Sequence, residues 1–155
     1  MAAKTMVYPV FFILLTLIML VLVPRRRIVG LLPFGLIAGA GVALVVQTTA
    51  IWYLGLWRWR YLEPFGWRGL PLFISATWIP AEIIFAHYIE ETPKELTVLY
   101  ILGFAGIATG VEWWFVRGGY QVPIHWSLLY TFILGVVIHT LLSLYVLAIA
   151  RRRTA

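Results

Sequence analysis

The sequence contains no cysteine and no aspartate, and only 12% of its residues are charged. Without cysteine the chain has no disulfides, no thiolate metal sites and no cysteine nucleophile. Hydrophobic residues make up 63% of the sequence, well above the ~45–50% that is usual in soluble domains. The composition excludes an ordinary soluble domain and indicates an integral membrane protein.

The length of 155 residues accommodates about five spans of ~20 residues with short loops, and no separate soluble domain. We predict an all-α fold, a polytopic transmembrane helical bundle that forms a single domain over residues 1–155. The predicted spans cover residues 6–23, 32–54, 70–90, 96–116 and 127–150.

Most of the arginines behind the net charge of +6 lie in short runs at the ends of predicted spans. This arrangement is typical of topology signals and lipid contact, so we expect membrane lipids and no nucleic acid as partners. Arg25 to Arg27 follow the first apolar run, whereas a secretory signal has its charges in front, so we interpret the run as an uncleaved span. An outside N-terminus and a cytoplasmic C-terminus place seven Lys and Arg residues inside and five outside, which favours that orientation.

Small residues recur every four positions in the second span, at Gly35, Gly39 and Ala43, and Gln47 continues the same stripe. Such a stripe predicts a helix-packing seam, with a substrate or ligand role for the Gln47 amide as the alternative. In the fourth span Gly103, Gly106 and Gly110 likewise suggest close helix contact.

The segment 55–69, GLWRWRYLEPFGWRG, interleaves aromatic rings with arginines. This mixture suits the headgroup layer, where amphipathic rings and snorkelling arginines are both satisfied. We predict an anchor on the outer membrane surface, and binding of a phosphate or a lipid headgroup is the alternative.

Glu82 and His139 each lie twelve residues from the outer ends of the third and fifth spans, roughly 18 Å deep at 1.5 Å per residue. This shared depth allows the two side chains to meet near the middle of the membrane. A lone carboxylate there is costly, so Glu82 must be protonated or paired with a cation such as protonated His139. The pair is interpreted as either a proton-exchanging or substrate-orienting site, or a structural contact.

A second polar cluster is predicted near the outer face, formed by Glu112, Arg117 and His125. It is interpreted either as a pocket for a headgroup or small ligand, or as a Glu112–Arg117 salt bridge that caps the bundle. That salt bridge requires the helix to end between the two residues, because a spacing of five does not place them on one face.

His87 precedes Glu90 and Glu91 by about one turn, so a local hydrogen bond is its expected contact. No two histidines have the spacing of a helical zinc site, and His87 and His139 differ in predicted depth by ~7 Å, which argues against haem. We therefore expect no metal and no cofactor.

Three motifs carry a family resemblance: WIPAEII in the third span, ELTVLYILGFAGIATGVEWWF with Glu112, and VPIHWSLLYTF. Through them the region from Arg26 to Tyr145 resembles an uncharacterised family of small multi-span membrane proteins of endospore-forming Firmicutes. The resemblance implies a bacterial cytoplasmic membrane and names no activity. Pro80, Ala81 and Glu82 are also similar to the start of a motif in multi-span lycopene cyclases, but Ile83 replaces its second acid, which argues against acid-catalysed cyclisation.

The expected function is non-enzymatic: binding of a lipid, a hydrophobic small molecule or another membrane subunit in a polar groove between helices. An intramembrane enzyme acting on a lipid or isoprenoid, with Glu82 as general acid and His139 as its partner, is the first alternative. A proton-coupled transporter is the second. The predicted ligand-binding residues are Gln47, Glu82, Glu112, Arg117, His125 and His139.

Overall fold

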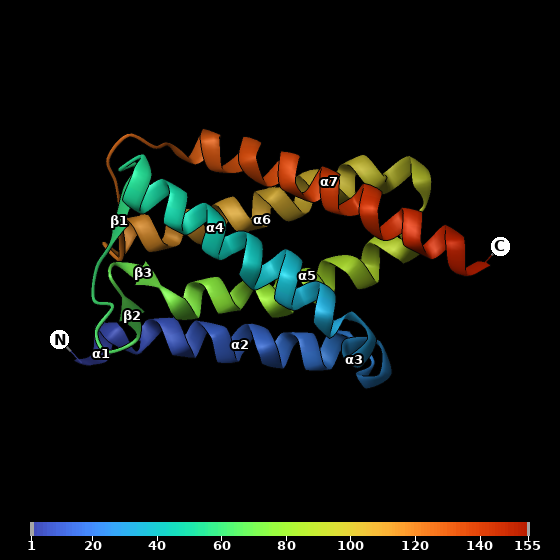
Figure 1. Cartoon of the computed structure of the whole chain (residues 1–155), viewed down its shortest axis with the longest axis horizontal. Helices are drawn as coiled ribbons and strands as arrows, with labels where there is room; N and C mark the ends of the chain where they lie inside the picture. Colours follow the sequence, from blue (N-terminus) through green and yellow to red (C-terminus); the bar gives the residue numbers. More distant parts are fainter. Residues whose placement is uncertain (1, 155) are drawn as a thin grey trace.

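The structure, a computed structural model, describes the backbone of residues 2–154 and the side chains of residues 4–150. Over this range the helices form five antiparallel rods, and the two chain ends lie at opposite ends of the bundle (Figure 1). The first rod consists of α1 (Ala2–Thr5) and α2 (Val7–Leu22), and the second rod consists of α3 (Arg25–Phe34), η1 (Gly35–Gly41), α4 (Val42–Thr48) and η2 (Thr49–Tyr53). The third rod is α5 (Leu72–Glu91), the fourth is η3 (Lys94–Leu96) with α6 (Thr97–Arg117), and the fifth is α7 (Leu128–Thr154).

The second to fifth predicted spans correspond to helices that are long and apolar enough to cross a membrane. The first predicted span corresponds to α2, which has only 16 residues. The second rod begins at Arg25 and not at residue 32, because the helix starts directly after Pro24 and continues through Pro33. The last helix runs past the predicted end at residue 150, and the side chains of Arg151 to Arg153 lie outside the described ones.

The small-residue stripe of the second rod is a helix-packing seam, as predicted, and the helix that it contacts is α5. Gly35 and Gly39 are buried in η1, a stretch of π-helix, and a Cβ added at Gly39 would lie only 2.4 Å from the carbonyl oxygen of Trp78. A Cβ at Gly35 would lie 2.8 Å from a side-chain carbon of Ile83. Only glycine permits this approach of two backbones, so the seam positions the turn of α5 that carries Glu82.

The glycines of α6 do not pack against another helix of the described bundle, so the prediction of close helix contact is wrong for them. A Cβ at Gly103, Gly106 or Gly110 would meet no atom within 4 Å. The packed side of α6 is instead that of Ala105, whose Cβ would lie 3.3 Å from a Cβ on Gly135 of α7. The α6 glycines therefore face outward from the described bundle.

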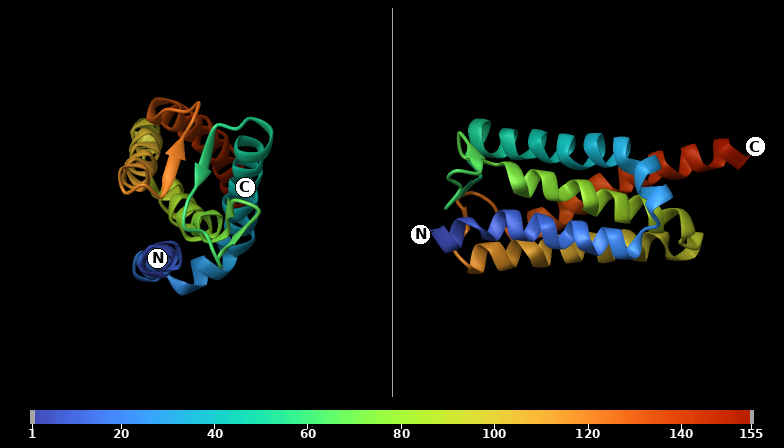
Figure 2. Two further views of the ribbon diagram at one scale, coloured as in Figure 1. Left: turned by 90° about the vertical axis from the view of Figure 1, so that its left-hand side faces the viewer. Right: turned by 90° about the horizontal axis from the view of Figure 1, so that it is seen from below.

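The aromatic segment folds back over one end of the bundle. Strand β1 (Trp57–Trp59) pairs with β4 (Gln121–Pro123), and β2 (Gly66–Trp67) pairs with β3 (Leu70–Pro71), both antiparallel. Figure 2 shows these strands across the end that also carries the N-terminus, which we call the β end. The opposite end, with α3, η3 and the C-terminus, is called the turn end. Trp57 is only 5% exposed, so part of the segment forms a lid and not merely a surface anchor.

The bundle consists of two packing units. In the first, α5 packs extensively on α2 and on the second rod, and we call these three the three-rod unit. In the second, α6 packs mainly on α7, forming the α6–α7 hairpin. The two units meet chiefly where α7 contacts α5 and where β1 pairs with β4. Any site between α5 and α7 therefore lies at the junction of the two units.

Candidate functional site

Glu82 and His139 form a buried pair at this junction. Glu82 comes from α5 and His139 from α7, and each residue is 1% exposed. His139 Nε2 lies 3.1 Å from Glu82 Oε1, so the two side chains, which the sequence places at the same depth, are in contact. We call these two residues the buried pair.

The backbone of α7 determines which nitrogen of His139 faces the carboxyl group. His139 Nδ1 lies 2.6 Å from the carbonyl oxygen of Gly135, which can only accept a hydrogen bond, so Nδ1 carries a hydrogen. Nε2 then faces Glu82 Oε1, and one further proton can reside on either atom. With that proton the pair is neutral overall, as an ion pair or as an imidazole and a carboxylic acid.

The buried pair is incompletely satisfied. Among the described residues, Glu82 Oε2 has no hydrogen-bond partner, and the Nε2–Oε1 contact lacks the alignment of a good hydrogen bond. Ser75, two turns before Glu82 on α5, also has a buried, unpartnered hydroxyl. Unpaired polar groups in an apolar interior raise the free energy of the folded state, so these atoms destabilise this part of the core.

Aromatic rings enclose His139. The rings of Phe104 and Phe85 have centroids 4.7 and 4.9 Å from that of the imidazole, and Trp78 lies at 6.1 Å. Water is excluded, so the arrangement suits the holding of a proton more than reaction with a soluble substrate.

Gln47 is buried where the second rod meets the lid. Its Oε1 accepts hydrogen bonds from Trp57 Nε1 at 2.9 Å and from Trp59 Nε1 at 3.0 Å. The side chain therefore ties β1 to the second rod. A ligand role for Gln47 stays a prediction, and its carbonyl oxygen is already engaged.

The predicted outer cluster is divided among three places. Glu112 Oε1 accepts a hydrogen bond of 3.1 Å from Gln121 Nε2 of β4. Arg117 lies over the ring of Trp113, 5.6 Å from its centroid, and His125 is exposed in the loop before α7. The predicted Glu112–Arg117 salt bridge is wrong, because α6 stays helical through Arg117 and the two residues remain on different faces.

Arg117 instead lines a pocket at the β end, which we call the aromatic pocket. Its volume is about 470 Å³, and it is lined by Trp113, Trp114, Arg117, Gly118 and Tyr120. Trp114 and Tyr120 are stacked with centroids 5.9 Å apart. The pocket thus combines aromatic faces with one guanidinium group.

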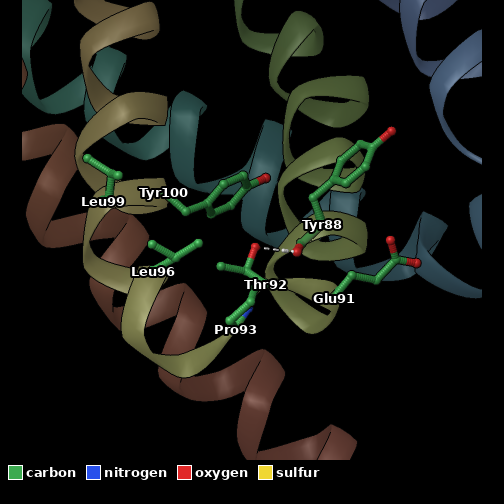
Figure 3. A pocket seen from close by; sticks show the side chains of 7 residues that line it. All are labelled: Tyr88, Glu91, Thr92, Pro93, Leu96, Leu99 and Tyr100. Atoms are coloured by element: carbon green, nitrogen blue, oxygen red, sulfur yellow. Dashed lines mark hydrogen bonds between the residues drawn. The ribbon is translucent and has the colours of Figure 1, made fainter.

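A second pocket lies at the turn end, between α5 and α6 (Figure 3). Its volume is about 430 Å³, and its walls are mostly apolar. The Thr92 hydroxyl donates to the Tyr88 carbonyl within it, and Glu91 stands at its margin. Its lining residues are Tyr88, Glu91, Thr92, Pro93, Leu96, Leu99 and Tyr100. Neither pocket is lined by Glu82 or His139.

Several contacts connect residues that are distant in the sequence, and no spacing rule could have found them. Arg27 forms an ion pair of 2.5 Å with Glu90, and the Tyr8 hydroxyl donates to the carbonyl of Arg60.

The expected local contact of His87 is a 3.7 Å approach of Nδ1 to Glu91 Oε1, too long for a hydrogen bond.

The described side chains include no group of three or more His, Cys, Asp or Glu residues that could hold a metal ion. The candidate functional groups among the described residues are therefore the buried pair and the aromatic pocket. Comparison of the chain with protein-family models, with curated proteins and with solved structures finds no match.

Proposed function

We propose that the chain is a five-span protein of a bacterial cytoplasmic membrane, with its N-terminus outside and its C-terminus in the cytoplasm. Four long apolar helices support this, as do the large exposed hydrophobic side chains on the outside of the bundle, such as Val21, Ile37 and Ile107. Helix α2 is ~24 Å long at 1.5 Å per residue, and α1 continues it toward the β end. The resemblance to the Firmicutes family supports the bacterial host.

Its proposed function is to bind a phospholipid, with the headgroup in the aromatic pocket. The observation that carries this proposal is the placement of Arg117 among Trp113, Trp114 and Tyr120 at the end of α6. A guanidinium group binds phosphate oxygens through two parallel hydrogen bonds, and ring faces attract a headgroup ammonium. Tryptophan and tyrosine are also the residues that prefer the headgroup layer.

The test is native mass spectrometry of the purified protein supplied with defined phospholipids. Arg117→Gln is expected to lower lipid occupancy by about tenfold or more, because a charge-assisted hydrogen bond contributes about 1.5–3 kcal/mol. Arg68→Gln is the matched control, since Arg68 also lies over a tryptophan, 5.3 Å from the Trp67 centroid, but does not line the pocket. Equal occupancy in wild type and Arg117→Gln, or equal losses in both variants, would contradict the proposal.

The same sample separates the other candidate functions. A second polypeptide at fixed stoichiometry would favour a subunit of a membrane assembly, and a retained hydrophobic molecule other than phospholipid would favour a small-molecule binder. The buried pair supports an intramembrane enzyme with Glu82 as general acid, or a proton-coupled transporter. A lipid product with a mass that was not supplied would favour the enzyme.

A further inference from the structure

We propose that Glu82 and His139 form a binding site for one exchangeable proton, and that its occupancy controls whether the α6–α7 hairpin stays docked on the three-rod unit. The site does not depend on the lipid-binding proposal. It rests on the position of the buried pair, on the orientation of its atoms and on the atom that lacks a partner.

The position comes first. α5 belongs to the three-rod unit and α7 to the hairpin, and α7 supplies most of the hairpin's helix contacts with α5. The 3.1 Å contact between His139 Nε2 and Glu82 Oε1 crosses that junction where both side chains are 1% exposed. Whatever changes the charge of the pair therefore acts between the two units.

The buried pair has no net charge only when it holds one proton in addition to the hydrogen on Nδ1. The hydrogen on Nδ1 is directed to the Gly135 carbonyl, so the shared proton resides on Nε2 or on Oε1. If it leaves to water, a bare carboxylate faces a neutral imidazole lone pair, and Oε2 has no donor among the described residues. If a second proton arrives, an imidazolium faces a neutral carboxylic acid. Each of these states leaves one uncompensated charge in an apolar interior.

Among the described side chains, neither Glu82 nor His139 forms an ion pair with a third residue. From α6 the titratable side chain near Glu82 is Tyr100, whose hydroxyl donates to the Phe85 carbonyl at 3.3 Å. η1, which packs on the Glu82 turn, has no titratable residue, and on α5 itself the nearest is His87, more than a turn away. Within the described chain, hydration of the pair by separation of α7 from α5 is thus the remaining way to stabilise an extra charge.

The absence of native cysteine permits a direct test by spin labelling. One label is placed by Arg26→Cys in the three-rod unit and the other by Ala148→Cys near the end of α7, both exposed positions at the turn end. Pulsed electron paramagnetic resonance then measures the distance between labels in the full chain from about pH 5 to about pH 10. A control pair, Arg26→Cys with Glu91→Cys, lies within the three-rod unit.

Near neutral pH we expect one distance population, and in alkali a second, longer one, for the first label pair only. Glu82→Gln should remove the alkaline population, because an amide cannot lose the proton and can donate to Nε2. If that variant does not accumulate, His139→Gln leaves the carboxylate without a cation, so the longer population should be present near neutral pH and disappear in acid. A single distance in wild type at every pH, alkaline opening in Glu82→Gln equal to wild type, or a docked His139→Gln near neutral pH would each overturn the proposal.

Discussion

At the scale of single residues, the apolar interior separates satisfied polar groups from unsatisfied ones. Gln47 Oε1 accepts two indole hydrogen bonds, whereas Glu82 Oε2 and the Ser75 hydroxyl have no partner among the described residues. A buried polar network that is satisfied rigidifies its surroundings, and one that is not is a candidate for exchange or movement. We therefore infer that Gln47 stabilises the lid, and Glu82 stays a proposed functional residue.

Replacement of Gln47 tests this assignment. Gln47→Leu leaves the indole N–H groups of Trp57 and Trp59 without their acceptor, and each buried unsatisfied group costs about 1–3 kcal/mol. We expect a clear loss of thermal stability in detergent, measured by the unfolding midpoint. Thr140→Val serves as the control, because Thr140 is exposed and bonds only within its own helix. A Gln47→Leu midpoint equal to that of wild type would show that the lid does not depend on this side chain.

The sequence predicted some of these residues well and others not at all. Glu82 and His139 were expected at the same depth, because depth in a span follows from counting residues at a fixed rise. The ion pair of Arg27 with Glu90 joins positions 63 residues apart, and no local pattern specifies it. Depth is encoded along one chain segment, whereas lateral partners depend on how the rods are rotated against one another.

At the scale of helices, two glycine-bearing faces that look alike in the sequence have different environments. Gly39 meets the backbone of α5, whereas Gly106 meets nothing within 4 Å. Both lie in small-residue patterns at helical spacing, and either pattern predicts close packing. The rotation of each helix about its axis decides which pattern is used, and that rotation comes from the whole bundle.

Matched alanine substitutions at these two glycines test the packing. Gly39→Ala would force a Cβ to within 2.4 Å of the Trp78 carbonyl oxygen, and overpacking of this kind costs about 1–3 kcal/mol. Gly106→Ala adds a methyl group in open space and should stabilise the helix by up to about 1 kcal/mol. Unfolding midpoints in detergent are expected to fall for the first variant and to stay level or rise for the second. The reverse order would mean that α6, and not η1, provides the tight helix contact.

At the scale of the whole molecule, the two ends of the bundle differ only slightly in basic residues. Seven Lys and Arg residues belong to the turn end and five to the β end. The excess favours a cytoplasmic turn end. The β end carries the folded lid and the aromatic pocket, so this orientation would present the headgroup site to the outer leaflet.

Single cysteines introduced at the two ends measure the orientation directly, because the native chain has none. Glu63→Cys lies in the exposed part of the lid, and Glu95→Cys lies in the exposed turn between α5 and α6. In intact bacterial cells a membrane-impermeant maleimide should label the first variant and should label the second only after the membrane is permeabilised. If only Glu95→Cys is labelled in intact cells, the orientation is the opposite one, and the aromatic pocket lies at the inner leaflet. Lipid selectivity should then follow the inner leaflet, since the headgroups available to Arg117 are those on its own side of the membrane.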